Sequence, residues 1–150
     1  MLIQQLNRTD AEKVFVVVRN VDGGGSITTG LGAALTPDSA SDDGVGAVRS
    51  TAALSRLFAG VARSDIAINA YGLIQCWGFA ASVAISQSVG SWTITTGDNL
   101  RHAGAAGHFT SVIVSEALST QLYRFIVAMG DVADTISNPR TYMSGFVRAM

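Results

Sequence analysis

The sequence predicts an all-β protein: a small β-barrel-like or sandwich-like domain with an extended N-terminal arm and at most one short helix. One observation is that no charged side chain lies between Asp65 and Asp98, which leaves 32 uncharged residues suited to a buried sheet. A second is that Val83 and Ile85 alternate with small residues, which is the period of a strand with one buried face. Polar residues interrupt the stretch too often for the run of about 20 apolar residues that a membrane helix needs.

The N-terminal third alternates between strand and loop signals. Residues 14–18 are β-branched and aromatic and predict a strand, followed by a glycine-rich turn. Residues 27–35 predict a weaker strand, and residues 36–46 have the composition of a loop. Residues 47–57 place apolar side chains near helical spacing, so we expect a helix of about three turns there.

The uncharged stretch and the residues before it predict strands over 58–62, 71–79, 81–86 and 92–96. Gly78 lies between two of these strands and predicts a bulge or a sharp bend, because glycine tolerates backbone conformations that other residues avoid.

The C-terminal third alternates in the same way. We expect loops over 101–107 and 131–140, and strands over 109–118, 122–129 and 142–149. A helix through residues 119–128 is the alternative to the second of these strands.

Domain organisation follows from this division. Residues 1–57 are expected to form the N-terminal arm with a strand and loop region, and residues 58–150 the barrel, within a single compact unit. No repeat of fixed period is visible in the sequence.

The charge content indicates which partners the protein has. Only 14% of the residues are charged, against about 25% in typical domains, and the net charge is −1. That balance favours neither nucleic acid nor an anionic membrane as a partner. Charge depletion and the use of nine Arg but one Lys indicate surfaces that meet other protein chains, although abundant small residues also explain few charges. The residues expected at such interfaces are Arg8, Arg19, Arg49, Arg56, Arg140 and Arg148.

Catalytic and metal-binding patterns are weak. Residues 25–32 imitate a phosphate-binding loop, but Leu31 and Gly32 stand where Lys and Ser or Thr are required. Metal-ligating residue types occur at Asp98, His102 and His108. Their spacing along the chain matches no recognised pattern of residues that coordinate a metal directly. Cys76 is the only cysteine and is expected as a small buried residue. We therefore predict no enzyme activity, no catalytic residue, no cofactor and no metal.

A series of short motifs carries a resemblance to a known family. In order along the chain these are Gly60-Val61-Ala62, the strand from Gly72 to Gly78 with Gln75 inside it, Val83-Ala84-Ile85, the turn Thr96-Gly97-Asp98-Asn99-Leu100, the Gly/Ala-rich run Ala103 to Gly107, and Gly145-Phe146-Val147-Arg148. The series resembles the small decoration, or cement, proteins of tailed-bacteriophage capsids over about a third of the chain. Residues 1–57 match nothing in that family.

The resemblance implies a structural virion protein on the capsid surface, made in the host cytoplasm. It implies a homotrimer that binds at three-fold or quasi-three-fold sites and clamps neighbouring subunits of the major capsid protein, which stabilises the genome-filled head. The alternative is a β-barrel that binds a ligand, a carbohydrate or a receptor, for example a phage fibre module. Its site would be lined by Tyr71, Trp77, Phe79 and Trp92, although aromatic residues on strands more often belong to a core.

Overall fold

The computed structural model describes residues 12–36, 45–86, 93–103, 106–111, 126–133 and 140–149. Within them the protein is all-β, as the sequence predicts. The only helix in these ranges is a 3-10 helix, η1 (Ala52–Leu57). The strands are β1 (Val14–Asn20), β2 (Gly32–Leu35), β3 (Gly46–Arg49), β4 (Phe58–Ala62), β5 (Tyr71–Ser86), β6 (Thr93–Ile94), β7 (Asn99–His102), β8 (Phe109–Ser111), β9 (Ile126–Ala128), β10 (Val132–Ala133) and β11 (Arg140–Arg148).

The first five strands close into a small barrel. Their order is β1-β3-β2-β4-β5, and β1 pairs with β5 to complete the ring. The β1–β3 pair is parallel, and the other four pairs are antiparallel. Closure leaves fewer open strand edges, because each strand finds a partner on both sides over at least part of its length.

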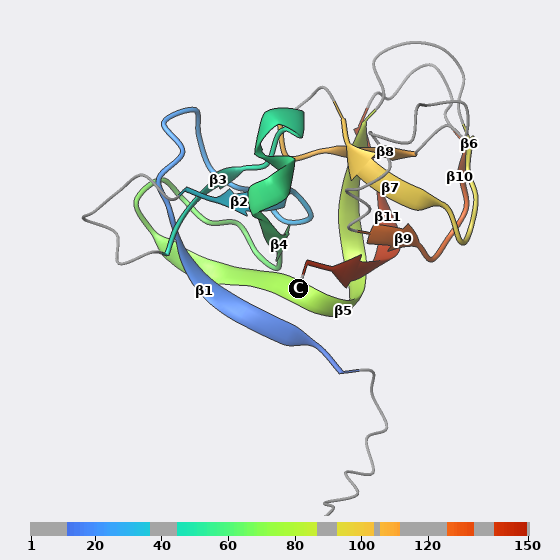
Figure 1. The fold of residues 1–150 in the computed structure, drawn as a ribbon, viewed down its shortest axis with the longest axis horizontal. Coiled ribbons are helices and arrows are strands. Elements are labelled where there is room, and N and C mark those ends of the chain that lie inside the picture. Colours follow the sequence, from blue (N-terminus) through green and yellow to red (C-terminus); the bar gives the residue numbers. More distant parts are fainter. Residues whose placement is uncertain are drawn as a thin grey trace, which may run out of the picture.

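Strand β5 takes part in both halves of the fold. It is 16 residues long and runs under both sides of the fold, bending on the way (Figure 1). Gly78 lies within it at φ +97°, and a Cβ at that position would run into the carbonyl oxygen of Glu12. Only glycine fits there without strain, so the bend that the sequence predicts at Gly78 is confirmed.

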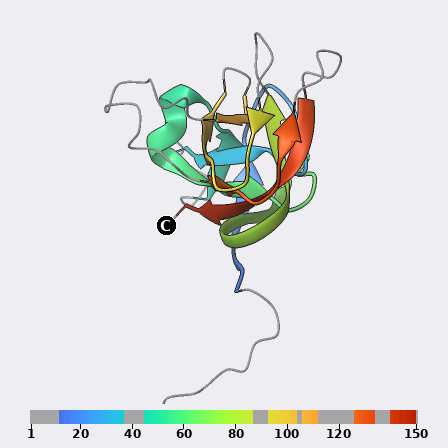
Figure 2. The ribbon, with the colours of Figure 1, turned by 90° about the vertical axis from the view of Figure 1, so that its right-hand side faces the viewer.

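Beyond the bend, β5 belongs to a second ring of strands. Its order is β5-β11-β9-β7-β8, and the parallel pair Ile85↔Phe109 joins β8 back to β5. The remaining pairs in this ring are antiparallel. Figure 2 looks at this side of the molecule. One parallel and four antiparallel pairs, in the same succession as in the first barrel, give the two rings the same topology.

We refer to the two rings as repeats. The first repeat comprises β1 to β4 with β5 as far as Trp77, and the second comprises β5 from Ala80 onward with β6 to β11. Each repeat contains the sequence Ile-Thr-Thr-Gly, at residues 27–30 and 94–97, which are 67 positions apart. The isoleucines pair in the same way, Ile27 with Ile66 and Ile94 with Val132, both antiparallel.

The backbone hydrogen bonds around the two motifs also match. The Gly30 amide donates to the Ala62 carbonyl at 3.0 Å, and the Gly97 amide donates to the Ala128 carbonyl at 2.8 Å. The chain therefore does contain a repeat, and the expectation of none is wrong. The repeat is not visible in the sequence because the two halves share only their strand pairing and one four-residue motif, while most other residues differ.

Each repeat has its own apolar core. The first is built around Ile27, Ile66 and Ile74, and the second around Ile94, Phe109 and Ile126. Phe58 and Val61, on β4 of the first repeat, pack into the core of the second repeat. The two repeats are thus joined by a shared strand and by shared packing.

Two of the expected elements are wrong. Residues 47–57 do not form one helix: β3 occupies the start, and η1 is only six residues long. The reason is tertiary, because Val48 pairs with Ala34 and Ala47 is completely buried. The expected loop over 101–107 begins inside β7, where Arg101 pairs with Thr110.

Other expectations are confirmed in part. The strands over 14–18, 58–62 and 142–149 are present, and the two strands expected on either side of Gly78 form one continuous strand, β5. Ile126–Ala128 is strand rather than helix, and β10 lies within the loop expected over 131–140. Residues 112–125 and the N-terminal residues 1–11 lie outside the described residues. The expected boundary after residue 57 falls between η1 and β4, inside the first barrel.

Candidate interaction surfaces

The first repeat carries an apolar outer face on β1 and β5. Val17 pairs with Leu73 and Arg19 pairs with Tyr71, so these side chains share the outer side of the barrel with Phe15, two residues before Val17. The exposed fractions are 37% for Phe15, 55% for Val17, 66% for Tyr71 and 44% for Leu73. We call Phe15, Val17, Tyr71 and Leu73 the β1–β5 face.

Four large apolar side chains on two paired strands form a contiguous patch rather than scattered exceptions. Single exposed apolar residues are ordinary, whereas adjoining ones mark sites of protein contact. The sequence predicts strands over 14–18 and 71–79 but does not reveal the patch, because β1 and β5 are distant in sequence. The signal was the unbroken apolar run of β1, in which inward and outward residues are both hydrophobic.

The predicted interface arginines lie on different elements. Arg19 is on β1, Arg56 is on η1 and Arg148 is near the end of β11. Arg19 Nη2 donates to Asn69 Oδ1 at 3.4 Å, and Arg148 Nη2 donates to Asn99 Oδ1 at 3.1 Å.

Two further predicted arginines fall where side chains are not described. Arg8 lies outside the described residues, and Arg140 begins β11 with only its backbone described. The described arginines do not form one cluster on one element, and of them Arg19 adjoins the β1–β5 face directly through its pairing with Tyr71.

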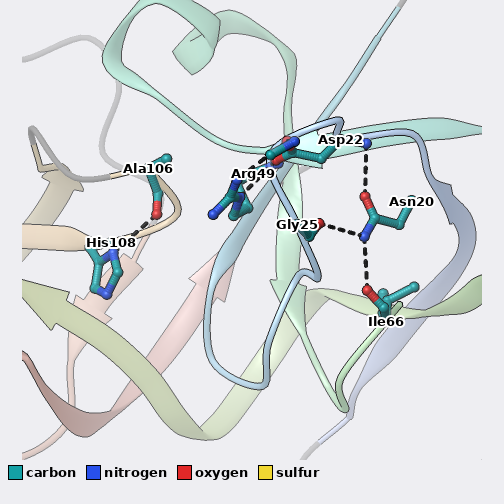
Figure 3. Close-up of polar contacts among 8 residues, drawn as sticks. Asn20, Asp22, Gly25, Arg49, Ile66, Ala106 and His108 are labelled. Atoms are coloured by element: carbon teal, nitrogen blue, oxygen red, sulfur yellow. Dashed lines mark hydrogen bonds and ion pairs between the residues drawn. The ribbon is translucent and has the colours of Figure 1, made fainter. Parts of the chain in front are cut away.

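Arg49 has a structural partner within the chain. Its Nε donates to Asp22 Oδ2 at 2.7 Å, and its backbone amide donates to the same oxygen at 3.0 Å (Figure 3). The Gly24 amide donates to Asp22 Oδ1 at 2.7 Å. The Arg49 side-chain hydrogen bond holds the pKa of the Asp22 carboxyl below its usual value. Arg49 therefore holds the turn after β1 in place.

Asn20 completes that turn from inside the barrel. Its side chain is fully buried, and Nδ2 donates to the carbonyls of Gly25 at 3.1 Å and Ile66 at 2.8 Å (Figure 3). Its Oδ1 accepts from the Asp22 amide at 2.9 Å. A buried amide with its donors and acceptor used stabilises one loop conformation. Sequence reasoning missed this residue, since a lone Asn at the end of a strand carries no distinctive pattern.

Ser50 and His102 form a buried polar pair between the two repeats. Ser50 Oγ lies 3.1 Å from His102 Nδ1, and the imidazole packs between Phe58 and Phe109, with ring centroids 5.3 and 5.2 Å away. Burial lowers the pKa of His102 to about 4, so the ring is neutral at pH 7.

The Ser50–His102 pair has the structural setting of a core contact rather than of a nucleophile and its base. Ser50 is fully buried, and its carbonyl accepts from the Gly107 amide at 2.6 Å. Its amide donates to the Gly32 carbonyl at 2.8 Å. These bonds tie β2 and β3 of the first repeat to the turn before β8 in the second.

The three residues considered as metal ligands, Asp98, His102 and His108, do not converge on one point. Asp98 Oδ2 accepts from the Thr95 amide at 2.9 Å, and His108 Nδ1 lies 3.0 Å from the Ala106 carbonyl (Figure 3). His102 is taken up by the pair with Ser50. In the described ranges, no group of three or more His, Cys, Asp or Glu side chains converges on a point. Cys76 is buried, as expected, and its Sγ lies 3.4 Å from the Val14 carbonyl.

The aromatic residues considered for a ligand site are also dispersed. Trp77 packs edge-to-face on Phe146 with centroids 5.3 Å apart, and Tyr71 belongs to the β1–β5 face. Phe79 lines a hollow of about 30 Å³ between β4 and β5. Ligand pockets are usually about 300–1,000 Å³, so this hollow is too small for a sugar. Trp92 lies outside the described residues.

No helix in the described part of the chain has the length and apolar character to cross a membrane. No protein-family model matches the sequence, and no curated protein matches it.

Proposed function

We propose that this chain is a structural virion protein, a decoration or cement protein of a tailed-bacteriophage capsid. In this proposal it binds the outer shell as a homotrimer at three-fold or quasi-three-fold sites. There it clamps neighbouring subunits of the major capsid protein and stabilises the genome-filled head. It acts without a catalytic residue, a cofactor or a nucleic-acid or membrane partner.

The observation that carries the proposal is the bare β1–β5 face on a protein with few charges. Val17 and Tyr71 are more than half exposed, and only 14% of the chain is charged. Apolar surface of this kind is stabilised when another chain covers it. The series of short motifs resembles the decoration proteins, and this resemblance suggests that the covering chains belong to a phage capsid.

A clamp works through buried area rather than through chemistry. A standard protein interface buries about 1,600 Å². Contacts repeated across a shell reinforce one another. A copy that is bound to one coat subunit is held at a high effective concentration near the next subunit, so the second contact forms more easily. The small barrel with its loops held by Asn20 and Asp22 suits such a role, since a rigid clamp loses little entropy on binding.

The test has two steps. Light scattering on a sizing column should give a mass near three times 15.6 kDa. The protein should then co-sediment with expanded heads of the phage that encodes it, prepared without this protein, and should raise the temperature at which filled heads release DNA. Failure to bind such heads, with the protein folded, would overturn the proposal.

A receptor-binding or sugar-binding barrel is the rival function. It predicts a change in tryptophan fluorescence on adding the ligand, together with no affinity for heads. The hollow beside Phe79 is too small to favour it.

A further inference from the structure

The two repeats touch each other through a turn and a strand edge. The Gly30 carbonyl, in the turn of the first repeat, accepts from the Ala84 amide of β5 in the second repeat at 2.9 Å. A Cβ on Gly30 would lie 3.0 Å from Ser82 Oγ and 3.0 Å from the Tyr142 ring. The turn thus sits directly on the outer face of the β5–β11 pair.

The β1–β5 face is the counterpart of that covered surface. Val17 pairs with Leu73 in the first repeat as Ala84 pairs with Tyr142 in the second, and the interval from Val17 to Ala84 is the same 67 residues that separates the Ile-Thr-Thr-Gly motifs. Ala84 is 2% exposed, whereas Val17 is 55% exposed. At this position the second repeat is covered and the first is bare, whereas Tyr142 is 56% exposed and its counterpart Leu73 is 44% exposed.

The turn has a counterpart as well. Gly97 occupies the position of Gly30, with φ +98° against +84°, and donates the matching hydrogen bond to its own β9. A Cβ on Gly97 would meet nothing within 4 Å, whereas one on Gly30 would meet Ser82. The second repeat therefore presents the same turn with nothing from the described chain seated against it.

Among the described residues, β1 has no strand partner on its β3 side before Arg19, and this edge offers the amide donor that the turn requires. The Arg19 amide donates to the Val45 carbonyl beside β3, and β3 pairs with β1 only at Arg19 and Asn20. The Val17 amide, two residues earlier on the same side of the strand, lies beyond the end of β3. It corresponds to the Ala84 amide, the group that bonds the Gly30 carbonyl.

A third correspondence involves the apolar core. Val61 on β4 and Val83 on β5 belong to one cluster across the two repeats, and Val83 is fully buried. The counterpart of Val83 is Val16, which is 40% exposed, and the counterpart of Val61 is Val127 on β9. Val16 and Val127, the counterparts of two residues that share one apolar cluster, are thus both partly exposed.

We infer that the β1–β5 face binds a second copy of this chain, through the turn Thr95–Asp98 of that copy. The contact between chains repeats the contact inside the chain. The Gly97 carbonyl of one copy accepts from the Val17 amide of the next, the Gly97 α-carbon rests on Phe15 and Leu73, and Val127 covers Val16.

Such a contact is head-to-tail, because one surface comes from each repeat. Head-to-tail contacts close into a ring or extend into a filament. The inference deepens the proposed homotrimer and rests on it for the number of chains. A closed ring of three copies would contain six repeats, alternately linked by a shared strand and by this contact.

The first experiment introduces a charge into the β1–β5 face. Val17→Lys places a charge where the neighbour would seat, and Ile68→Lys is the matched control, since Ile68 is 48% exposed on a turn outside both surfaces. Sedimentation velocity of Val17→Lys should show the 15.6 kDa monomer at concentrations where the wild type and Ile68→Lys are assembled. Circular dichroism checks that both variants fold.

The second experiment traps the contact. In the contact between the two repeats, a Cβ at Gly30 would lie 3.0 Å from Ser82 Oγ. Gly97 is the counterpart of Gly30 and Phe15 is the counterpart of Ser82, so cysteines at 97 and 15 of two copies should be close enough for a disulfide. Because Gly97 has φ +98°, Gly97→Cys strains the backbone, and circular dichroism must first show that the double variant folds. The folded double variant Phe15→Cys/Gly97→Cys should form a ladder of cross-linked chains under mild oxidation. Ile68→Cys/Gly97→Cys is the control and should form none.

The outcomes separate this inference from the proposed function. Assembled wild-type protein without the cysteine ladder, or with Val17→Lys unchanged in mass, overturns the contact and leaves head binding standing. A ladder in a protein that does not bind heads supports the contact and overturns the decoration role. A wild type that stays monomeric at high concentration overturns the contact.

Discussion

His102 shows at the scale of one residue how burial sets a chemical property. Its ring lies between Phe58 and Phe109 and contacts Ser50, and burial lowers its pKa from 6.5 to about 4. The unfolded chain takes up a proton near pH 6.5, but the folded chain does so only near pH 4. The stability that His102 contributes is therefore present above pH 6.5 and is lost as the pH falls toward 4.

The first prediction follows from that difference. The free energy of unfolding should fall by up to about 3 kcal/mol between pH 7 and pH 4 through this group. His102→Asn removes the titration, so its urea-unfolding free energy should vary less over that interval than that of the wild type. If the free energy of unfolding depended on pH equally steeply in the two proteins, His102 would not be a buried neutral imidazole.

Asp22 gives a second prediction for a single residue. Its carboxylate accepts from Arg49 Nε, the Arg49 amide and the Gly24 amide. Asp22→Ala leaves these donors without their acceptor, so the free energy of unfolding at pH 7 should fall by about 2 kcal/mol. Asp22→Asn retains one acceptor oxygen and should lose less. Urea titration of both variants provides the comparison.

At the scale of elements, each Ile-Thr-Thr-Gly turn is held by one aspartate. Asp65 Oδ1 accepts from the Thr29 amide at 2.7 Å and from Thr29 Oγ1 at 2.9 Å. Asp131 Oδ1 accepts from the Thr96 amide at 2.6 Å and from Thr96 Oγ1 at 2.9 Å. In both cases the bond from the threonine amide is the main reason that the carboxyl pKa is lowered.

The third prediction compares these two turns. Because the bonds are the same, Asp65→Ala and Asp131→Ala should both lower the midpoint of urea unfolding, and by similar amounts. Thr29→Val and Thr96→Val lose only the hydroxyl donor and should have smaller effects. A loss confined to one aspartate would show that the two turns are not equivalent in solution.

The bend of β5 supports a fourth prediction. Gly78 has φ +97°, and a Cβ there would run into the Glu12 carbonyl. Gly78→Ala should therefore lower the free energy of unfolding by about 2 kcal/mol or more, since the residue must be strained and the chain before β1 must shift. Gly23→Ala, at a turn where a Cβ meets nothing within 4 Å, is the control for replacing glycine. Both are measured by thermal unfolding at one pH.

At the scale of the whole molecule, the repeats share β5 and are joined by the bonds around Ser50 and Gly107. Neither repeat has a complete ring of strands without that strand. The fifth prediction is a single unfolding transition, with near-ultraviolet and far-ultraviolet circular dichroism changing together. Two separate transitions would show that the repeats fold as independent units.

The all-β class, the strand structure on each side of Gly78 and the low charge content can be predicted from the amino-acid sequence alone. These properties follow from local period, from glycine and from composition, which need no knowledge of distant partners. The sequence also identified Cys76 as a buried residue. Residues 47–57 were misread because Ala47 and Val48 suit a helix locally, whereas pairing with β2 makes them a strand.

Which segments of the chain are equivalent depends on contacts between residues that are distant in sequence. Ile27 and Ile94 carry the same four-residue motif, but their equivalence depends on pairing with Ile66 and Val132. The β1–β5 face likewise exists only once Val17 lies beside Leu73. The physical reason is that strand pairing is non-local: each strand shows the period of a sheet, while its partner and its register are set by long-range contacts.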